Sequence, residues 1–534
     1  MDMRSSTGPL LEPRRMAFME PISRLHGTNP FDPAWEALVR GALRSDYVPA
    51  DGVGCSPGGV PSGNLERLTA ELAVGVVCAA RDLESGVVGT PRELGVYQGA
   101  ALYALWEEYG SLLQGIIDRD EVEVPFYDAF VERHRFLFHH PGIAVPEPSH
   151  LLALFYQARR AWYFTWKKIR GGSKGAAAAR VAIWQASMGS DACTYAGSLY
   201  HRMDEIPVLI TGETGTGKEL AAECVGWSRY LPFDPQARRF ALKYAGEMHV
   251  RNLCEVPREL IESALFGHKR GSFTGAAADA TGCFALPKAY GSLFLDEIGE
   301  LPEHVQVKLL RPLQSREYVP IGETRPRKLL GRHLFATHRD LEALCGEGKF
   351  RADLLERMNG VPIHMPSLRE MIDEAPEEMR DYVRGFVADK IDDPAQVEAW
   401  TERVAGAIRA TRAGYAWPRN LRELKNYTER CLLTDSGASL RAVAVPEGAA
   451  AVTPSEPPSS GSPNSGLLGA RAEEGRVTVE ELTRAYVTRV YVLTHQNQSE
   501  TARRTGLTWR MVGRMIDPVR LMRWLGKGRG KEGT

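Results

Sequence analysis

The chain has 534 residues, which is enough for about three or four domains of ordinary size. Hydrophobic residues make up 43% of the sequence and charged residues 25%, a composition that excludes a wholly disordered, collagen-like or coiled-coil protein. The formal net charge is −1, from 66 basic and 67 acidic residues, so the overall charge indicates neither a nucleic-acid nor a membrane partner.

Targeting and redox features are sparse along the sequence. The best apolar run, over residues 72–80, has about half the length that a membrane-spanning helix needs, so we expect no such helix. The amino-terminal segment lacks the apolar stretch of a signal peptide, and we expect a cytoplasmic protein. The 8 cysteines are scattered without a Cys-x-x-Cys pair, which favours reduced thiols over disulfides or a zinc site.

Residues 1–180 form the first region, and their apolar spacing predicts a mainly helical fold with amphipathic helices over 65–83, 91–117 and 149–170. The 149–170 segment interleaves aromatic residues with Lys and Arg. This pattern favours a packing helix, with a ligand pocket as the alternative. Three nearby histidines could bind a metal, but they lack partners at metal-ligand spacing: His134, His139 and His140. By position the region is regulatory or sensory, of unknown type.

A phosphate-binding loop follows a short apolar strand over 207–211 and precedes a helical run over 220–228. Glycines let backbone N–H groups surround a phosphate, the helix N-terminus adds its dipole, and Lys218 would bridge the β- and γ-phosphates of ATP. Glu219 stands where such loops usually have Ser or Thr as a magnesium ligand. The residues of this predicted ATP site are Gly212, Glu213, Thr214, Gly215, Thr216, Gly217, Lys218 and Glu219.

A second apolar run, over 291–295, ends in the carboxylates Asp296 and Glu297. A strand that ends in two carboxylates supplies the groups that a phosphate loop lacks for ATP hydrolysis. Asp296 would hold Mg²⁺, and Glu297 would polarise the attacking water.

Between these motifs lies a glycine-flanked loop, Gly271, Ser272, Phe273, Thr274, Gly275 and Ala276. An exposed Phe between small residues is costly unless it contacts a partner. The loop resembles the Gly-Ala-Phe-Thr-Gly-Ala signature of the AAA+ activators of sigma-54 RNA polymerase, with Ser272 in place of Ala. The resemblance implies that this loop, and Phe273 and Thr274 in particular, contacts the sigma factor.

The resemblance also implies roles for single residues elsewhere. Asn252 would sense the γ-phosphate and restrain the catalytic Glu, although the segment before it, 227–251, is longer than usual. His338 occupies the sensor I position, where the family has Asn. Arg351 and Arg357 would be arginine fingers that reach a neighbouring subunit, and Arg422 would be sensor II.

Family boundaries place an α/β AAA+ ATPase subdomain over 185–370 and its helical lid over 371–442. The family implies a homo-oligomeric, hexameric ring. A linker follows over 443–475, where residues 446–466 include five Pro, five Ser and three Gly.

Residues 476–534 carry twelve Lys and Arg against five Asp and Glu, a local charge of about +7. Two short helical patterns around Gly506 resemble the Fis-type helix-turn-helix of the same activators. The second helix would enter the major groove of double-stranded DNA, with base contacts from Thr508, Trp509, Arg510 and Arg514.

The sequence therefore predicts a DNA-bound ATPase that uses ATP and Mg²⁺ to remodel the closed complex of sigma-54 RNA polymerase. Ser272, His338 and the long 227–251 segment keep an alternative open, a nucleotide-sensing DNA-binding regulator that does not engage sigma-54. A remodeler of some other protein is a third possibility, but it would not need a helix-turn-helix.

Overall fold

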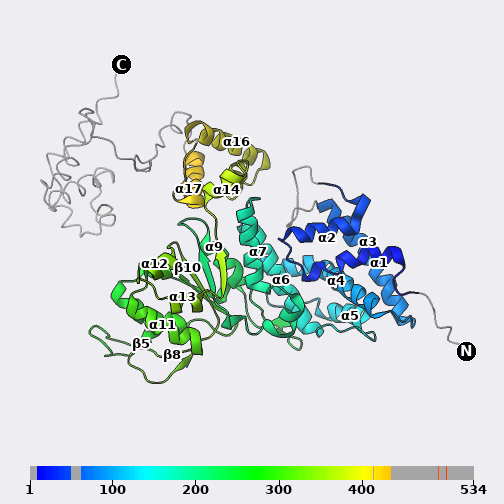
Figure 1. Ribbon diagram of the computed structural model, residues 1–534, viewed down its shortest axis with the longest axis horizontal. Coiled ribbons are helices and arrows are strands. Elements are labelled where there is room, and N and C mark those ends of the chain that lie inside the picture. The colour runs from blue at the N-terminus through cyan, green and yellow to red at the C-terminus, as the bar shows by residue number, and fades with distance from the viewer. Residues whose placement is uncertain are drawn as a thin grey trace, which may run out of the picture. The chain divides into compact units, whose positions relative to one another are not determined.

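A computed structural model describes residues 9–49, 62–412 and 414–433, together with the single positions 487, 491 and 501 (Figure 1). The chain divides into two compact units, Met1–Val443 and Ala444–Thr534. The predicted linker and helix-turn-helix, including Thr508, Trp509, Arg510 and Arg514, lie outside the described residues. None of the described helices is long and apolar enough to span a membrane.

The amino-terminal region is helical, as predicted. Within its described residues the α-helices are α1 (Pro13–Ile22), α2 (Pro33–Leu43), α3 (Ser62–Glu84), α4 (Pro91–Arg119), α5 (Tyr127–Phe138), α6 (Pro148–Lys168) and α7 (Lys174–Met188). Local sequence explains several starts. Thr90 and Glu93 form a reciprocal capping box at α4, with Pro91 in its first turn, and the side chain of Ser173 caps α7.

The core is a five-stranded parallel sheet in the order β11-β1-β10-β7-β4. Its strands are β1 (Val208–Thr211), β4 (Met248–Asn252), β7 (Ser292–Asp296), β10 (Arg332–Thr337) and β11 (Val361–His364). The helices of this part are α8 (Ala192–Thr194), α9 (Lys218–Trp227), α10 (Ile261–Phe266), α11 (Glu303–Ser315), α12 (Leu341–Gly346) and α13 (Ala352–Met358). Because all five strands are parallel, their carboxyl ends meet at one edge, where ligands bind in open α/β sheets.

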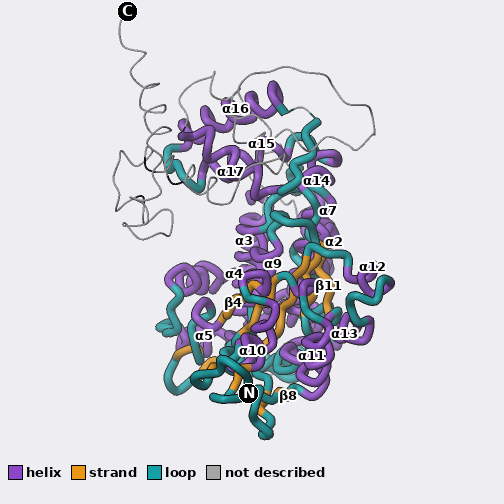
Figure 2. Tube along the Cα trace, turned by 90° about the vertical axis from the view of Figure 1, so that its left-hand side faces the viewer, coloured by secondary structure: helices purple, strands orange, loops and turns teal. Residues whose placement is uncertain are grey.

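Three two-stranded antiparallel pairs extend from the core: β2 (Phe233–Asp234) with β3 (Arg239–Phe240), β5 (Gly267–His268) with β6 (Ala280–Thr281), and β8 (Glu317–Tyr318) with β9 (Arg327–Lys328). A helical subdomain follows, with α14 (Leu368–Glu374), α15 (Glu378–Ala388), α16 (Pro394–Thr411) and α17 (Asn420–Leu433). These helices have their own hydrophobic cluster and contain no strand in the part that the structure describes (Figure 2). An α/β layer is therefore followed by a helical subdomain, which we call the lid.

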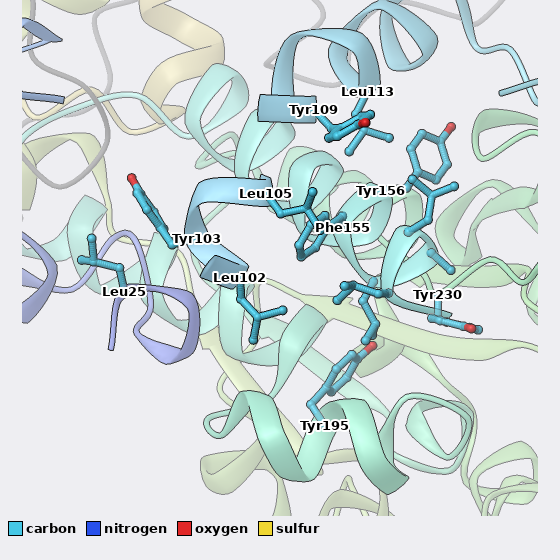
Figure 3. Packing of buried hydrophobic residues seen from close by; sticks show 14 of the residues in the cluster. Leu25, Leu102, Tyr103, Leu105, Tyr109, Leu113, Phe155, Tyr156, Tyr195 and Tyr230 are labelled. Atoms are coloured by element: carbon cyan, nitrogen blue, oxygen red, sulfur yellow. The ribbon is translucent and has the colours of Figure 1, made fainter. Parts of the chain in front are cut away.

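The amino-terminal helices share one hydrophobic cluster with the sheet. The cluster runs from Leu10 to Met365 and includes Val208 of β1 and Ile363 of β11. Helix α6 packs on α9, the helix after the phosphate loop, and α7 packs on β11. Figure 3 shows part of this cluster, from Leu25 through α4 and α6 to Tyr195 and Tyr230.

The long 227–251 segment forms part of this junction. Its β2–β3 hairpin places the ring of Phe240 in a stack on Tyr156 of α6, with 4.0 Å between ring centroids. The Phe240 N–H donates to the Val122 carbonyl at 2.8 Å, and the Val124 N–H donates to the Arg238 carbonyl at 2.9 Å. The added residues therefore join the ATPase core to the amino-terminal helices.

Candidate functional site

The phosphate loop follows β1 directly, and its glycines adopt backbone conformations that side chains disfavour. Gly215 has φ of +83°, and a Cβ there would lie 2.1 Å from the carbonyl oxygen of Arg419 in the lid. Glycine is thus required at this position both by conformation and by the close approach of the lid.

Lys218 is buried at the start of α9, and its Nζ donates to the carbonyl oxygens of Gly212 at 2.9 Å and Glu213 at 3.1 Å. Thr216 Oγ1 also donates to the Glu213 carbonyl, at 2.9 Å. Burial lowers the pKa of Lys218, while the charges of Glu297 and Asp296 act against this shift. The ammonium therefore lies beside the loop, opposite two carboxylates.

Asp296 ends β7, as the apolar run predicts, and its Oδ1 accepts the Glu297 N–H at 2.9 Å. Burial raises the pKa of Asp296, and the adjacent charge of Glu297 adds to the shift. Because the ionised form of Asp296 is destabilised in this way, a nearby cation would stabilise it.

Glu297 is held by His338 at the end of β10. His338 Nδ1 lies 2.6 Å from Glu297 Oε2, and the His338 N–H donates to the same oxygen at 3.4 Å. A His338 tautomer with its proton on Nδ1 would donate to this oxygen. The restraint on Glu297 that the resemblance assigns to Asn252 is thus made here by His338. Asn252 Oδ1 instead accepts the Cys254 N–H at 2.9 Å.

Lys218, Asp296 and Glu297 converge on a cavity of about 660 Å³, whose lining does not include the predicted residues Gly212, Glu213 and His338. Its lining contains residues 214–219 of the loop, Asn252, Asp296, Glu297 and Arg422, with Glu219 exposed in the first turn of α9. The end of α6 and the residues after it supply another wall: Phe164, Lys167, Lys168, Ile169 and Arg170. The sequence motifs contained no sign of this wall.

The lid is clamped to the phosphate loop through Glu213. Arg369 donates to both oxygens of the Glu213 carboxylate, and Asn420 Nδ2 donates to Glu213 Oε2 at 3.2 Å and to the Thr214 carbonyl at 3.1 Å. The bonds from Arg369 lower the pKa of Glu213 to about 2. Sequence reasoning missed Asn420, which is fully buried and also accepts the Leu368 N–H.

The two candidate arginine fingers do not line this cavity. Arg351 precedes α13 and forms a bidentate pair with Asp353, with bonds of 3.0 and 2.7 Å, and Arg357 is exposed on the same helix. Neither acts on the nucleotide cavity of its own chain in this structure.

The 271–276 loop lies between β5 and β6. Gly271 has φ of +77° and its N–H donates to the Ala276 carbonyl at 2.9 Å, which closes the loop. Thr274 and Gly275 are exposed. Phe273, expected to be exposed, is half-buried with its ring 4.9 Å from that of His268. The buried Ser272 Oγ has no hydrogen-bond partner among the described residues.

No cluster of three metal-ligating side chains occurs among the described residues, and that search covered the three histidines of the amino-terminal region. His134 Nε2 instead contacts the Pro146 carbonyl at 3.0 Å, and His140 Nε2 contacts the Phe136 carbonyl at 2.9 Å.

Part of the α/β core is similar to a known protein family. Residues 191–364 match the model of the sigma-54 interaction domain. Over 231 residues the chain is 40% identical to the DNA-binding transcriptional regulator NtrC of Azospirillum brasilense, covering 42% of this chain and 43% of that protein. It is 37% identical over 234 residues to the formate hydrogenlyase transcriptional activator FhlA of Escherichia coli (strain K12), covering 44% of this chain and 31% of that protein.

The matched part thus spans less than half the length of these curated relatives. A crystal structure of NtrX from Brucella abortus in complex with ATP also matches, at 21% identity and a TM-score of 0.37, over 70% of this chain and 76% of that chain. Residues 191–364 are therefore similar to the sigma-54 interaction domain, and part of the chain is similar to the transcriptional regulators NtrC and FhlA.

Proposed function

We propose that this chain is an ATP-hydrolysing transcriptional activator that binds upstream DNA and remodels the sigma-54 polymerase closed complex to open the promoter. One observation carries the proposal. Lys218, Asp296 and Glu297 converge on one cavity at the carboxyl edge of the sheet, in a domain of the sigma-54 interaction family.

The cavity has the groups that ATP hydrolysis requires. Backbone N–H groups of the loop and the N-terminus of α9 would bind the phosphates, and Lys218 would exchange its two carbonyl partners for phosphate oxygens. Glu297, oriented by His338, would take the proton of the attacking water. Asp296, whose ionised form needs a cation, would hold Mg²⁺, which when bound neutralises charge on the phosphates.

A continuous set of contacts supports coupling between this cavity and the 271–276 loop. The short helix η9 (Ile298–Glu300) follows Glu297 directly. Glu300 forms ion pairs with Arg339 at 3.2 Å and with Arg258 at 3.5 Å. Arg258 begins the short helix η7 (Arg258–Leu260), which leads into α10.

From α10 the contacts reach the loop itself. Ser263 Oγ lies 2.6 Å from His268 Nδ1, and the His268 ring packs against Phe273. Movement of Glu297 on loss of the γ-phosphate would therefore be transmitted to the Phe273 side chain, a nucleotide-driven switch. Release of Phe273 from His268 would present it to the sigma factor.

Arg351 and Arg357 support assembly into a ring. Both lie away from the nucleotide cavity of their own chain, and Arg357 is exposed, so a neighbouring copy would be their target as arginine fingers. The basic 476–534 segment would hold this ring at an upstream DNA site and so raise its concentration near the promoter.

The test is open-complex formation on a supercoiled sigma-54 promoter with purified protein and sigma-54 polymerase. We expect ATP to support open complexes and a nonhydrolysable analogue to fail. Lys218→Ala should lose both hydrolysis and open complexes while keeping DNA binding. Thr274→Ala should keep ATP hydrolysis and lose open complexes, because Thr274 is exposed at the tip of the loop.

Gly246→Ala is a matched control, since its Cβ would have no atom within 4 Å. This variant should behave as wild type in all three assays. ATP hydrolysis with no open complex, in wild type as well as in Thr274→Ala, would favour the alternative of a nucleotide-sensing DNA-binding regulator that does not engage sigma-54.

A further inference from the structure

A second, larger cavity lies within the amino-terminal helices. Its volume is about 1040 Å³, and its walls come from α2, α4, α6 and α7 together with residues 25–32 and 192–197. No residue lines both this cavity and the nucleotide cavity. Drug-sized ligands bind in cavities of about 300–1,000 Å³, so the space suits a small organic molecule.

Aromatic side chains dominate the walls. Four tryptophans line the cavity, Trp35, Trp106, Trp162 and Trp184, and all except Trp35 are only half-buried. Tyr103, Phe155 and Tyr195 add three further aromatic rings to the lining. Indole faces attract apolar rings and organic cations, because the ring face carries negative charge.

The charges in the cavity select between these possibilities. Glu107 lies half-buried in the wall, and no Lys, Arg or His of the described residues comes within ion-pair distance of it. Burial raises the pKa of Glu107, against the effects of a hydrogen bond from Tyr103 and of the more distant charge of Arg159. A cationic ligand would relieve the cost of this carboxylate.

Among the other charged groups of the lining, Arg159 opposes a cation, because its charge acts on Glu107, whereas Asp32 favours one. Arg159 carries the one guanidinium, which lies over the Trp162 ring at 4.6 Å, while its Nε donates to Gln114 Oε1 at 3.0 Å. Asp32 adds a second carboxylate, so the two acids outnumber Arg159. Burial lowers the pKa of His26, which keeps that ring neutral.

Both ring nitrogens of His150, which also lines the cavity, have hydrogen-bond partners within the protein. Its Nδ1 lies 2.7 Å from the Tyr230 hydroxyl and its Nε2 lies 2.9 Å from the Ala196 carbonyl.

We propose that this cavity binds a small organic cation, an amine on an aromatic or alicyclic body, with the amine at Glu107 and the body against the tryptophans.

Helix α6 connects this site to the nucleotide cavity. Phe155, Arg159 and Trp162 of α6 line the amino-terminal cavity, and Phe164 and Lys168 near its end line the nucleotide cavity. An occupant that displaces α6 therefore moves a wall of the ATP site. This regulatory part rests on the proposed use of ATP.

Binding is tested by isothermal titration calorimetry of the full chain with three probes that share a phenyl ring: 2-phenylethylamine, 2-phenylethanol and 3-phenylpropanoate. We expect the amine to bind about tenfold tighter than the alcohol, and the carboxylate to bind most weakly. Glu107→Gln should abolish the preference for the amine and keep the affinity for the alcohol. Glu108→Gln is the control, because Glu108 lies on the same helix, is exposed and lines neither cavity.

Ala158→Trp, on α6, fills the cavity from its wall and should abolish binding of all three probes. Three results would overturn the proposal: no heat from the amine at millimolar concentrations, equal binding to wild type and Ala158→Trp, or tightest binding of the carboxylate. None of these measurements needs ATP, sigma-54 or DNA, so they stand or fall apart from the proposed function.

The link through α6 is measured by titrating a nonhydrolysable ATP analogue with and without saturating 2-phenylethylamine. We expect the analogue affinity to change about fivefold or more, with the reciprocal change in amine affinity. Glu107→Gln should remove the change at the same amine concentration. Amine binding that leaves the analogue affinity unaltered would refute the link, and an analogue that does not bind at all would count against the proposed function instead.

Discussion

The fully buried Arg160 offers a direct test of the junction between α6 and the phosphate-loop helix. Its guanidinium donates to the carbonyl oxygens of Trp227 and Arg229, each at 2.6 Å, and its Nε donates to the Tyr156 carbonyl at 3.3 Å. Trp227 ends α9, where carbonyl groups have no partner within the helix. We predict that Arg160→Met destabilises the protein strongly.

The magnitude follows from two opposing effects. Hydrogen bonds to charged groups contribute about 1.5–3 kcal/mol each, so the two short bonds contribute about 3–6 kcal/mol together. Burial lowers the pKa of Arg160 to about 10. From an ordinary value of 12.5 this is a cost of about 3 kcal/mol for the charged form. Met removes both effects but leaves two carbonyl groups without their donor, at about 1–3 kcal/mol each. These ranges together give a net loss of about 2–9 kcal/mol, and we expect its lower part, about 2–4 kcal/mol, because losses above about 4–5 kcal/mol are exceptional.

Thermal unfolding is the assay. One kcal/mol shifts Tm by about 2–4 °C in domains of 150–250 residues, so a loss of about 2–4 kcal/mol in Arg160→Met should lower Tm by about 4–16 °C. Arg159→Met is the matched control, because the neighbouring Arg159 makes one side-chain hydrogen bond, to Gln114, and should cost about 1 kcal/mol. Equal shifts in Tm for the two variants would refute the reasoning.

Three further predictions concern the lid and the inserted hairpin. Arg369 holds the pKa of Glu213 at about 2, below its ordinary 4.5, so the ionised pair stabilises the fold above about pH 4.5 and loses its effect as the pH falls towards 2. Because the Glu213 side chain is 42% exposed, the ion pair contributes about 1 kcal/mol to the free energy of unfolding. The difference in this free energy between wild type and Glu213→Gln, measured by urea unfolding, should therefore shrink as the pH falls from about 4.5 towards 2. A difference independent of pH would contradict this account. Gly215→Ala should weaken binding of an ATP analogue about tenfold or more in a fluorescence titration, because its Cβ collides with a lid carbonyl. Gly406→Ala, in α16, where the Cβ meets only a side-chain end at 4.0 Å, should bind normally. Phe240→Ala should lower stability by about 3–5 kcal/mol in urea unfolding, with partial recovery in Phe240→Leu; a loss below 1 kcal/mol would show that the hairpin does not hold the junction.

Much of the nucleotide site could be predicted from the sequence, because its chemistry depends on residues at fixed short spacing. A phosphate loop needs a strand, a glycine-rich turn, Lys218 and a helix in succession, and all four are continuous in the chain. The same holds for Asp296 and Glu297, since a buried strand delivers whatever follows it to the edge of the sheet. Helical periodicity likewise revealed α3, α4 and α6.

The partner of each group was decided by the tertiary structure. Strands β4 and β10 lie on the two sides of β7, and they end at Asn252 and just before His338. Either residue could have restrained Glu297. The side-chain geometry shows that His338 does so in this structure. Asn420 reaches Glu213 from 207 residues further along the chain, which no local pattern encodes.

By itself, the sequence determined the motifs for ATP, the loop of the sigma-54 interaction family and the helical character of the amino-terminal region, because each rests on neighbours along the chain. Only the tertiary structure decided that α6 forms a wall of the nucleotide cavity, that the long 227–251 segment joins the amino-terminal helices to the core, and that a second cavity lies among the tryptophans. These features depend on packing between residues that are far apart in the chain. Such packing is determined by the shapes and burial of side chains, and the spacing of residues along the sequence does not encode it.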